Sequence, residues 1–186
     1  EVVFSEGKTR SFMCAALSER KDPTEELIFA TNLIKCVMNY MKDKPVLSSL
    51  HVCRGNWSKD ESILLKGPYT PLVPLFEETS PNILALEFST PRAGELDSLL
   101  SSEKIKENSI LALGVINPRT DVIETAQSII DRAREALKFI SKERLWLNPD
   151  CGFATFSNRP VSTFEIIEKK LEQLQIAKNA LREMYE

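Results

Sequence analysis

Apolar residues along this chain gather into four short runs, and each run predicts a β-strand. The runs cover Val46 to Val52, Ile83 to Phe88, Ile110 to Ile116 and Leu145 to Leu147. The second and third runs are almost entirely apolar, which is typical of strands that are covered on both faces. The pattern therefore predicts a buried sheet of four strands.

Between these runs, apolar positions recur with the 3.6-residue period of amphipathic helices. Three long helices are predicted: from Asp22-Pro23 to Lys44, over Asp121–Phe139, and from Ser162-Thr163 to Met184. Short helices are predicted after Ser58-Lys59-Asp60-Glu61, around Leu72 to Glu78, and over Glu95 to Leu100. We interpret the apolar stripes of the long helices as parts of the core, not as a cofactor site.

Strands that alternate with helices predict an α/β fold with a parallel sheet and right-handed crossovers. Each predicted strand ends in a polar loop, and chemistry at the carboxyl ends of strands is typical of a (β/α)8 barrel. A full barrel needs eight strands and about 250 residues, so the four units predicted over residues 1–186 form a single domain equal to half a barrel. No Gly-x-Gly-x-x-Gly motif lies between a strand and a helix, which disfavours dinucleotide binding.

The strand ends carry a candidate metal site. Successive side chains in a strand alternate faces, so His51 and Cys53 should project together from the end of the first strand. Glu87 ends the second strand and Cys151 follows the fourth. One histidine, two cysteines and one glutamate form a plausible tetrahedral zinc set. A carboxylate is the most readily displaced of these ligands, so a substrate thiol could replace it and be held as a thiolate.

Simpler interpretations stand beside this one. A single His-x-Cys pair is a weak signal, and Glu87 could instead form a salt bridge with Arg92 or Arg119. Asn148 and Asp150 could cap the turn before the last helix. Arg54, Arg92 and Arg119 could be ordinary ion-pair residues, or they could form an anion-binding rim. Cys14 and Cys36 are interpreted as small apolar core residues.

Composition and charge exclude several function classes. The chain is 42% hydrophobic and 27% charged, with a net charge of −3 and dispersed positive charges, which gives no support for binding nucleic acid or an anionic membrane. No apolar run is long enough to span a membrane or resembles a secretory signal. Four scattered cysteines do not suggest a disulfide framework, so we expect a reduced, cytoplasmic protein. The chain opens without an initiator Met, as the middle of a longer polypeptide would.

Four motifs in series resemble the catalytic domain of the cobalamin-independent methionine synthase family. They are His51-Val52-Cys53-Arg54-Gly55-Asn56, Leu86-Glu87-Phe88-Ser89-Thr90-Pro91-Arg92-Ala93-Gly94, Gly114-Val115-Ile116-Asn117-Pro118-Arg119-Thr120 and Asn148-Pro149-Asp150-Cys151-Gly152-Phe153. The resemblance implies a (β/α)8 barrel of the methionine synthase and uroporphyrinogen decarboxylase-like type, of which this chain would be the carboxyl-terminal half. It also implies zinc bound by His51, Cys53, Glu87 and Cys151.

The sequence departs from that family at one loop. Methionine synthases have a histidine after the seventh strand, thought to serve the methyl donor, whereas the loop here reads Ile116 to Thr120 and holds no histidine. The Arg-Gly-Asn-Trp sequence after Cys53 is closer to short single-barrel relatives, including epoxyalkane:coenzyme M transferases. Those relatives apply the same zinc–thiolate chemistry to an epoxide.

The resulting hypothesis is a Zn2+-dependent transferase that moves a methyl or other alkyl group to a thiol. Homocysteine and a methyltetrahydrofolate-like donor are the expected substrates, with epoxyalkane:coenzyme M-type chemistry or a non-catalytic zinc-binding half barrel as alternatives. His51, Cys53 and Cys151 are predicted as permanent ligands and Glu87 as the displaceable one. The remaining predicted roles are catalysis for Glu87 and Asp150, and substrate binding for Arg54, Arg92, Arg119 and Asn117. A second copy or the other half of the barrel is the expected protein partner, because an isolated half barrel would leave its strand edges unpaired.

Overall fold

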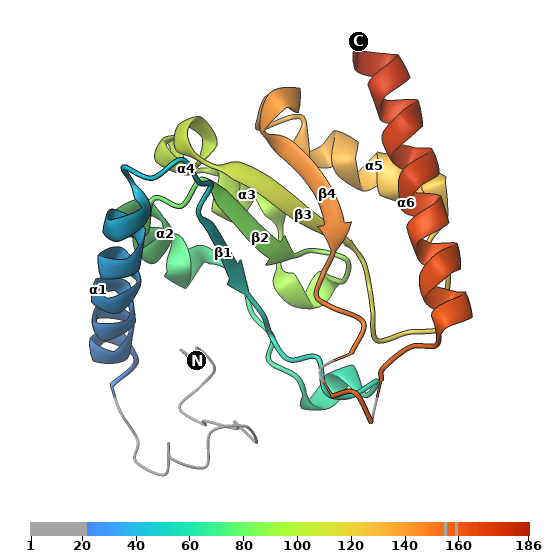
Figure 1. Ribbon diagram of the computed structural model, residues 1–186, viewed down its shortest axis with the longest axis horizontal. Coiled ribbons are helices and arrows are strands. Elements are labelled where there is room, and N and C mark those ends of the chain that lie inside the picture. Colours follow the sequence, from blue (N-terminus) through green and yellow to red (C-terminus); the bar gives the residue numbers. More distant parts are fainter. Residues whose placement is uncertain (1–21, 155, 159) are drawn as a thin grey trace.

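A four-stranded parallel sheet with the order β1-β2-β3-β4 forms the centre of the computed structural model (Figure 1). The structure describes residues 22–154, 156–158 and 160–186, so the predicted core position of Cys14 lies outside the described residues. The strands are β1 (Ser49–Val52), β2 (Ile83–Glu87), β3 (Ile110–Ile116) and β4 (Leu145–Pro149). Each strand pairs with the next one along the chain, which confirms the predicted alternation of strands and crossover helices.

The two central strands are buried because their sequences are apolar at nearly every position. Leu84 and Leu86 of β2 and Leu113 of β3 have no exposed surface. Leu86 and Leu113 are partners in the β2–β3 register, so apolar side chains lie level across the sheet. The carboxyl ends of all four strands meet at one edge, as the parallel order requires.

β1 begins at Ser49, three residues later than the apolar run predicts. The segment before it turns, with Lys44 N–H bonded to the carbonyl of Met41 and Val46 N–H bonded to that of Lys44. Val46 and Leu47 are consequently 53% and 63% exposed. The predicted strand is too long because Val46 and Leu47 are apolar, although they lie in this turn. Pro45, just before them, has no N–H to donate to a strand hydrogen bond.

The described part of the chain contains six α-helices. They are α1 (Pro23–Met41), α2 (Val73–Thr79), α3 (Leu96–Leu100), α4 (Glu103–Asn108), α5 (Ala126–Ala136) and α6 (Phe164–Tyr185). A short 3-10 helix, η1 (Glu61–Ile63), lies in the connection between β1 and α2. None of the described helices combines the length and apolar character needed to cross a membrane.

One predicted helix begins too early, and one short helix is missing from the prediction. α5 begins at Ala126 and not at Asp121, because the Thr125 hydroxyl caps the helix by accepting from Ser128 N–H at 3.1 Å. Val122, counted in the predicted stripe, lies in the preceding loop and is 70% exposed. α4 is not predicted at all, since six residues are too few to show a 3.6-residue period.

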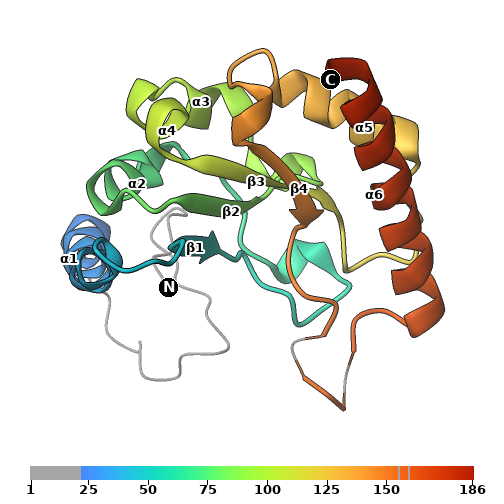
Figure 2. The same ribbon diagram turned by 45° about the horizontal axis from the view of Figure 1, so that its top comes forward.

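The helices form one layer beside the sheet. α2, α3, α4 and α5 lie on one side of it, while α1 and α6 stand beyond β1 and β4 at its two ends (Figures 1 and 2). The predicted core stripes of α1 and α6 are therefore only partly buried: Val37 of α1 and Phe164 of α6 are 57% and 83% exposed. Cys36, predicted in the core, is also exposed on α1.

Candidate metal centre

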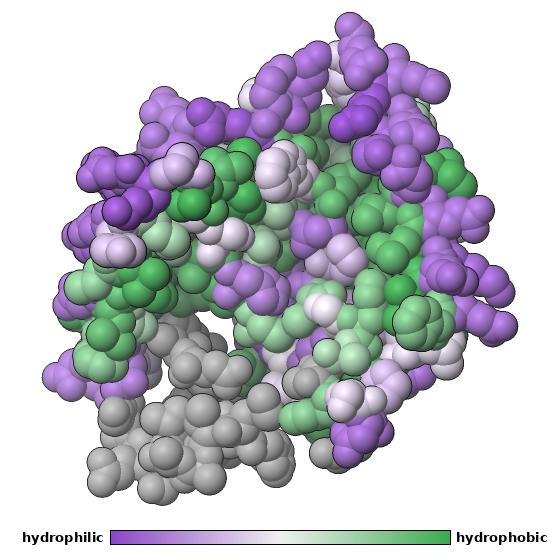
Figure 3. All heavy atoms as spheres, in the orientation of Figure 1, coloured by the Kyte–Doolittle hydropathy of each residue, from purple (hydrophilic) through white to green (hydrophobic). Residues whose placement is uncertain are grey.

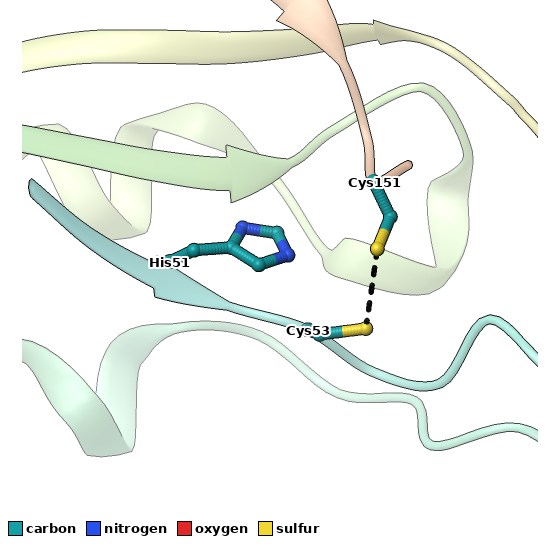
Figure 4. A group of neighbouring side chains, drawn as sticks. All are labelled: His51, Cys53 and Cys151. Atoms are coloured by element: carbon teal, nitrogen blue, oxygen red, sulfur yellow. Dashed lines mark hydrogen bonds between the residues drawn. The ribbon is translucent and has the colours of Figure 1, made fainter. Parts of the chain in front are cut away.

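His51, Cys53 and Cys151 come together at the carboxyl edge of the sheet (Figure 4). Their possible ligand atoms all lie within 4.8 Å of one another, and the two sulfurs are 3.7 Å apart. His51 and Cys53 share a face because they are two residues apart at the end of β1. Cys151 reaches the same point from the turn after β4, 98 residues later. In the part of the chain that the structure describes, this is the one group of His, Cys, Asp and Glu with metal-ligand spacing.

The hydrogen bonding of His51 suits a metal ligand. Its Nδ1 lies 2.8 Å from the carbonyl oxygen of Ala85 on β2. A carbonyl oxygen can only accept, so Nδ1 carries the proton and Nε2 keeps its lone pair in the neutral ring. Histidines that bind metals usually donate their other ring N–H in this way, which holds both tautomer and orientation.

The two thiols share one hydrogen bond, and this separates their protonation. The hydrogen bond from Cys53 lowers the pKa of Cys151 to about 7, against the effect of burial. The same bond, together with burial, raises the pKa of Cys53 to about 12. The pair therefore gives up its first proton easily and resists losing the second until a cation is near. Gly55 N–H donates to Cys53 Sγ at 3.3 Å and supports a thiolate there.

Glu87 lies beside this group but is held by arginines. The side chain is buried, with Oε2 accepting from Arg92 Nη2 at 3.1 Å and Oε1 accepting from the Arg54 backbone N–H at 3.2 Å. Arg119 Nη1 is 3.7 Å from Oε1. Burial, followed by the charge of Asp150, raises the pKa of Glu87 to about 7. The ion pairs with Arg92 and Arg119 that the sequence allowed are both present, and coordination by Glu87 stays a prediction.

Asp150 connects the ends of β2 and β4. It is 1% exposed and accepts hydrogen bonds from the backbone N–H groups of Phe88 and Ser89, the hydroxyl of Ser89, and Arg119 Nη2 at 2.9 Å. These bonds place the turn that carries Cys151 over the end of β2. The contacts favour support of a ligand by Asp150, while its predicted part in catalysis stays a prediction.

The four predicted substrate-binding residues donate to groups of the protein itself. Arg54 stacks on Tyr69, 4.0 Å from the ring centre, and donates to the carbonyls of Gly67 and Arg92. Arg92 and Arg119 bind carboxylates, and Asn117 Nδ2 donates to Glu61 Oε1 at 2.6 Å. Their role in binding a substrate stays a prediction.

A family model described as the catalytic domain of cobalamin-independent synthases matches residues 25–168. The chain belongs to the cobalamin-independent methionine synthase family. This match covers all four motifs on which the sequence resemblance was based.

Relatives within the family share limited identity with this chain. A methionine synthase from Pyrococcus horikoshii is 24% identical over 148 residues, which is 75% of this chain and 39% of that protein. A 5-methyltetrahydropteroyltriglutamate–homocysteine methyltransferase from Bacillus licheniformis is 23% identical, over 88% of this chain and 19% of that protein. The chain thus spans well under half the length of these curated relatives.

The fold is that of the family. The solved structure of a B12-independent methionine synthase from Shewanella sp. W3-18-1, in complex with selenomethionine, superposes with a TM-score of 0.63 and 23% identity. The superposition covers 81% of this chain and 43% of that one. The α/β fold with a parallel sheet is thereby confirmed as about half of a methionine synthase (β/α)8 barrel.

Two residues that contact the site could not be identified from sequence motifs. Glu61 of η1 contacts Asn117 and Arg119, although its sequence context marks only a helix start. The hydroxyl of Tyr69 accepts a hydrogen bond from the backbone N–H of Glu87 at 3.0 Å. Both lie in the long connection between β1 and β2, and no spacing rule ties that connection to the site.

We expect Gly114→Ala to disturb the site through backbone crowding. An added Cβ at Gly114 would lie 2.7 Å from the carbonyl oxygen of Leu86 and 3.0 Å from Asp150 Cα, and would also meet Asp150 Oδ1. The loss should be about 1–3 kcal/mol of unfolding free energy, measured by urea denaturation, because neither backbone atom can move aside. Gly152→Ala is the control, since nothing lies within 4 Å of a Cβ there. Equal stability of the two variants would contradict the prediction.

Proposed function

We propose that this chain is the zinc-binding half of a transferase that methylates the thiol of homocysteine. The observation that carries the proposal is the convergence of His51, Cys53 and Cys151 at the carboxyl edge of the sheet. Two sulfurs and one imidazole nitrogen form a donor set suited to zinc, and three protein ligands leave a fourth position for a substrate. The relatives named methionine synthase and 5-methyltetrahydropteroyltriglutamate–homocysteine methyltransferase support homocysteine and a methyltetrahydrofolate-like donor.

Each residue of the site has a separate role in the proposed reaction. Zinc, when bound, would hold the substrate sulfur as a thiolate at neutral pH. His51, Cys53 and Cys151 would hold the ion, Glu87 would be the ligand that a substrate sulfur can replace, and Asp150 would support Cys151. The thiolate forms a bond to the methyl carbon as the donor's bond to that carbon breaks, and the donor atom leaves with the electron pair and then takes a proton. His51 is the single histidine of the sequence and is assigned to the metal. Another group therefore supplies this proton.

The open ends of the sheet support a protein partner for this half barrel. Among the described residues, no strand pairs with the outer edges of β1 and β4. Apolar side chains are exposed along α1 and α6 (Figure 3), among them Phe29 and Tyr40 of α1, which are 59% and 75% exposed. An apolar groove also opens between β4 and α6, lined by Leu145, Leu147 and Leu174 among others. A parallel strand could pair with β4 in this groove and be covered by α6.

A complementary half barrel fits these edges better than a second copy does. A (β/α)8 barrel holds one helix outside each junction between neighbouring strands. In two copies joined edge to edge, α1 of one copy and α6 of the other would compete for the same junction (Figure 1). A partner with four strands and three connecting helices leaves one helix for each junction. We propose that activity requires such a half, supplied by further chain or by another polypeptide.

The proposed function is tested on the intact protein with its complementary half. We expect stoichiometric zinc by metal analysis, and methionine formation from homocysteine and a methyltetrahydrofolate donor. Coenzyme M as the thiol and epoxides as donors form a second arm of the assay, suggested by the Arg-Gly-Asn-Trp sequence after Cys53. Turnover in that arm alone would replace the substrates and keep the thiol chemistry. Zinc without turnover in either arm would favour a non-catalytic module, and absence of zinc would contradict the proposal.

A further inference from the structure

Glu61 and Glu87 both form ion pairs with the same two arginines, Arg92 and Arg119. Glu61 Oε1 lies 3.3 Å from Arg119 Nε, and its Oε2 lies 3.8 Å from Arg92 Nε. Glu87 lies 3.1 Å from Arg92 Nη2 and 3.7 Å from Arg119 Nη1. The two carboxylates therefore neutralise one shared pair of guanidinium groups.

We propose that Glu61 is a positioning residue that keeps Arg92 and Arg119 paired when Glu87 turns from them to the metal. The inference rests on the proposed function, in which Glu87 is the displaceable ligand. Glu87 cannot pair fully with the arginines and bind a metal with the same oxygens. Whenever Glu87 moves from the arginines to the metal, Arg92 and Arg119 each lose one carboxylate partner.

The cost of that exchange depends on what else neutralises the arginines. Arg119 has a further partner in Asp150 at 2.9 Å, so it keeps one carboxylate whatever Glu87 does. Arg92 has no such reserve, because Glu61 and Glu87 are its ion-pair partners among the described residues. Its side chain is 8% exposed, and a buried cation without a counter-charge is strongly unfavourable. Glu61 is therefore the group that allows Glu87 to leave Arg92.

The position of Glu61 suits this role. It comes from η1 and not from a strand end, so it is not part of the metal group itself. Its side chain is 30% exposed, compared with 2% for Glu87, so it can keep its charge without the same burial cost. Asn117 Nδ2 donates to Oε1 at 2.6 Å and holds the carboxylate between the arginines.

A purely structural role for Glu61 is the competing explanation, since it also ties η1 to the loop after β3. The two explanations differ in their dependence on Glu87. If Glu61 acts by compensating for the departure of Glu87, its removal matters only while Glu87 is present. If it merely holds two loops together, its removal matters equally with or without Glu87. A double-mutant cycle separates these cases.

The experiment measures zinc affinity by chelator competition in the intact protein, in four forms: wild type, Glu61→Gln, Glu87→Gln, and the double variant. We expect Glu61→Gln to lower zinc affinity about tenfold in the wild-type background, the size typical for residues that support metal ligands. In the Glu87→Gln background the same change should have no effect. The Co2+ spectrum of Glu61→Gln should also shift toward that of Glu87→Gln, because Glu87 spends less time on the metal.

Two further variants keep the test decisive. Glu61→Asp retains the charge and should restore most of the affinity that Glu61→Gln loses. Glu78→Gln is the control, because Glu78 pairs with Lys35 on the surface and forms no ion pair with Arg92 or Arg119 in the described structure. It should leave the affinity unchanged in both backgrounds. Equal losses with and without Glu87, or no loss at all, would overturn the inference while leaving the zinc site intact. Absence of zinc in the wild type would instead contradict the proposed function, and the inference with it.

Discussion

Replacing Cys151 with serine should remove stoichiometric zinc and abolish methyl transfer by the intact protein. Cys151 supplies one of two sulfurs to the candidate centre, and its pKa near 7 makes it the thiol that ionises first. A serine hydroxyl stays protonated at neutral pH and is a harder, weaker ligand for zinc. Loss of a residue that only supports a metal ligand lowers metal affinity by up to about 100-fold. Loss of the ligand Cys151 itself should therefore lower zinc affinity by more than this. Metal analysis after dialysis and a chelator competition measure the change.

Cys36→Ser is the control for this prediction. Cys36 is a free cysteine exposed on α1, and it is not part of the candidate metal group. Its replacement should leave zinc content and turnover at the wild-type level. If Cys151→Ser retained full zinc, Cys151 would not be a ligand, and the proposed centre would have to be abandoned.

Strand sequences reveal most of this fold because apolar burial leaves a local signal. β3 spans Ile110–Ile116, the same residues as its apolar run, since both of its faces are covered. β1 shows the limit of this reasoning, because it lies at the sheet edge and its apolar run continues into a turn. The stripes of α1 and α6 show it too: they reveal which face is apolar, but not whether anything covers that face.

The candidate metal centre could be predicted further than its surroundings. His51 and Cys53 are two residues apart at the end of one strand, so strand geometry alone places them together. Cys151 requires the strand order, which follows from alternating strands and helices. The arginine–carboxylate network depends on side-chain directions across three loops, and charge alone does not distinguish an anion-binding rim from internal ion pairs. Glu61 is therefore identified as part of the site only by its contacts with Arg92 and Arg119 in the structure.

Removal of one partner from the buried pair Arg119–Asp150 should cause the largest electrostatic loss of stability at the site. Although burial opposes its charge, the carboxylates of Glu87 and Asp150 raise the pKa of Arg119, and the pair has no exposed side-chain surface. Arg119→Met would leave Asp150 buried beside Glu87 without this cation. We expect a loss of about 3–5 kcal/mol in unfolding free energy at pH 7, measured by urea denaturation.

The loss caused by Arg119→Met should shrink as the pH falls. Burial raises the pKa of Asp150 even in the wild type, and removal of Arg119 raises it further. A folded-state pKa above the unfolded value makes folding less favourable as the pH rises through it, so protonation of Asp150 at low pH relieves the variant. Lys59→Met is the control, because the Lys59–Asp121 pair is about half exposed and should contribute no more than about 1 kcal/mol. A loss for Arg119→Met as small as that of the control would contradict the prediction and would mean that the hydrogen bonds from Phe88 and Ser89 are enough to stabilise Asp150.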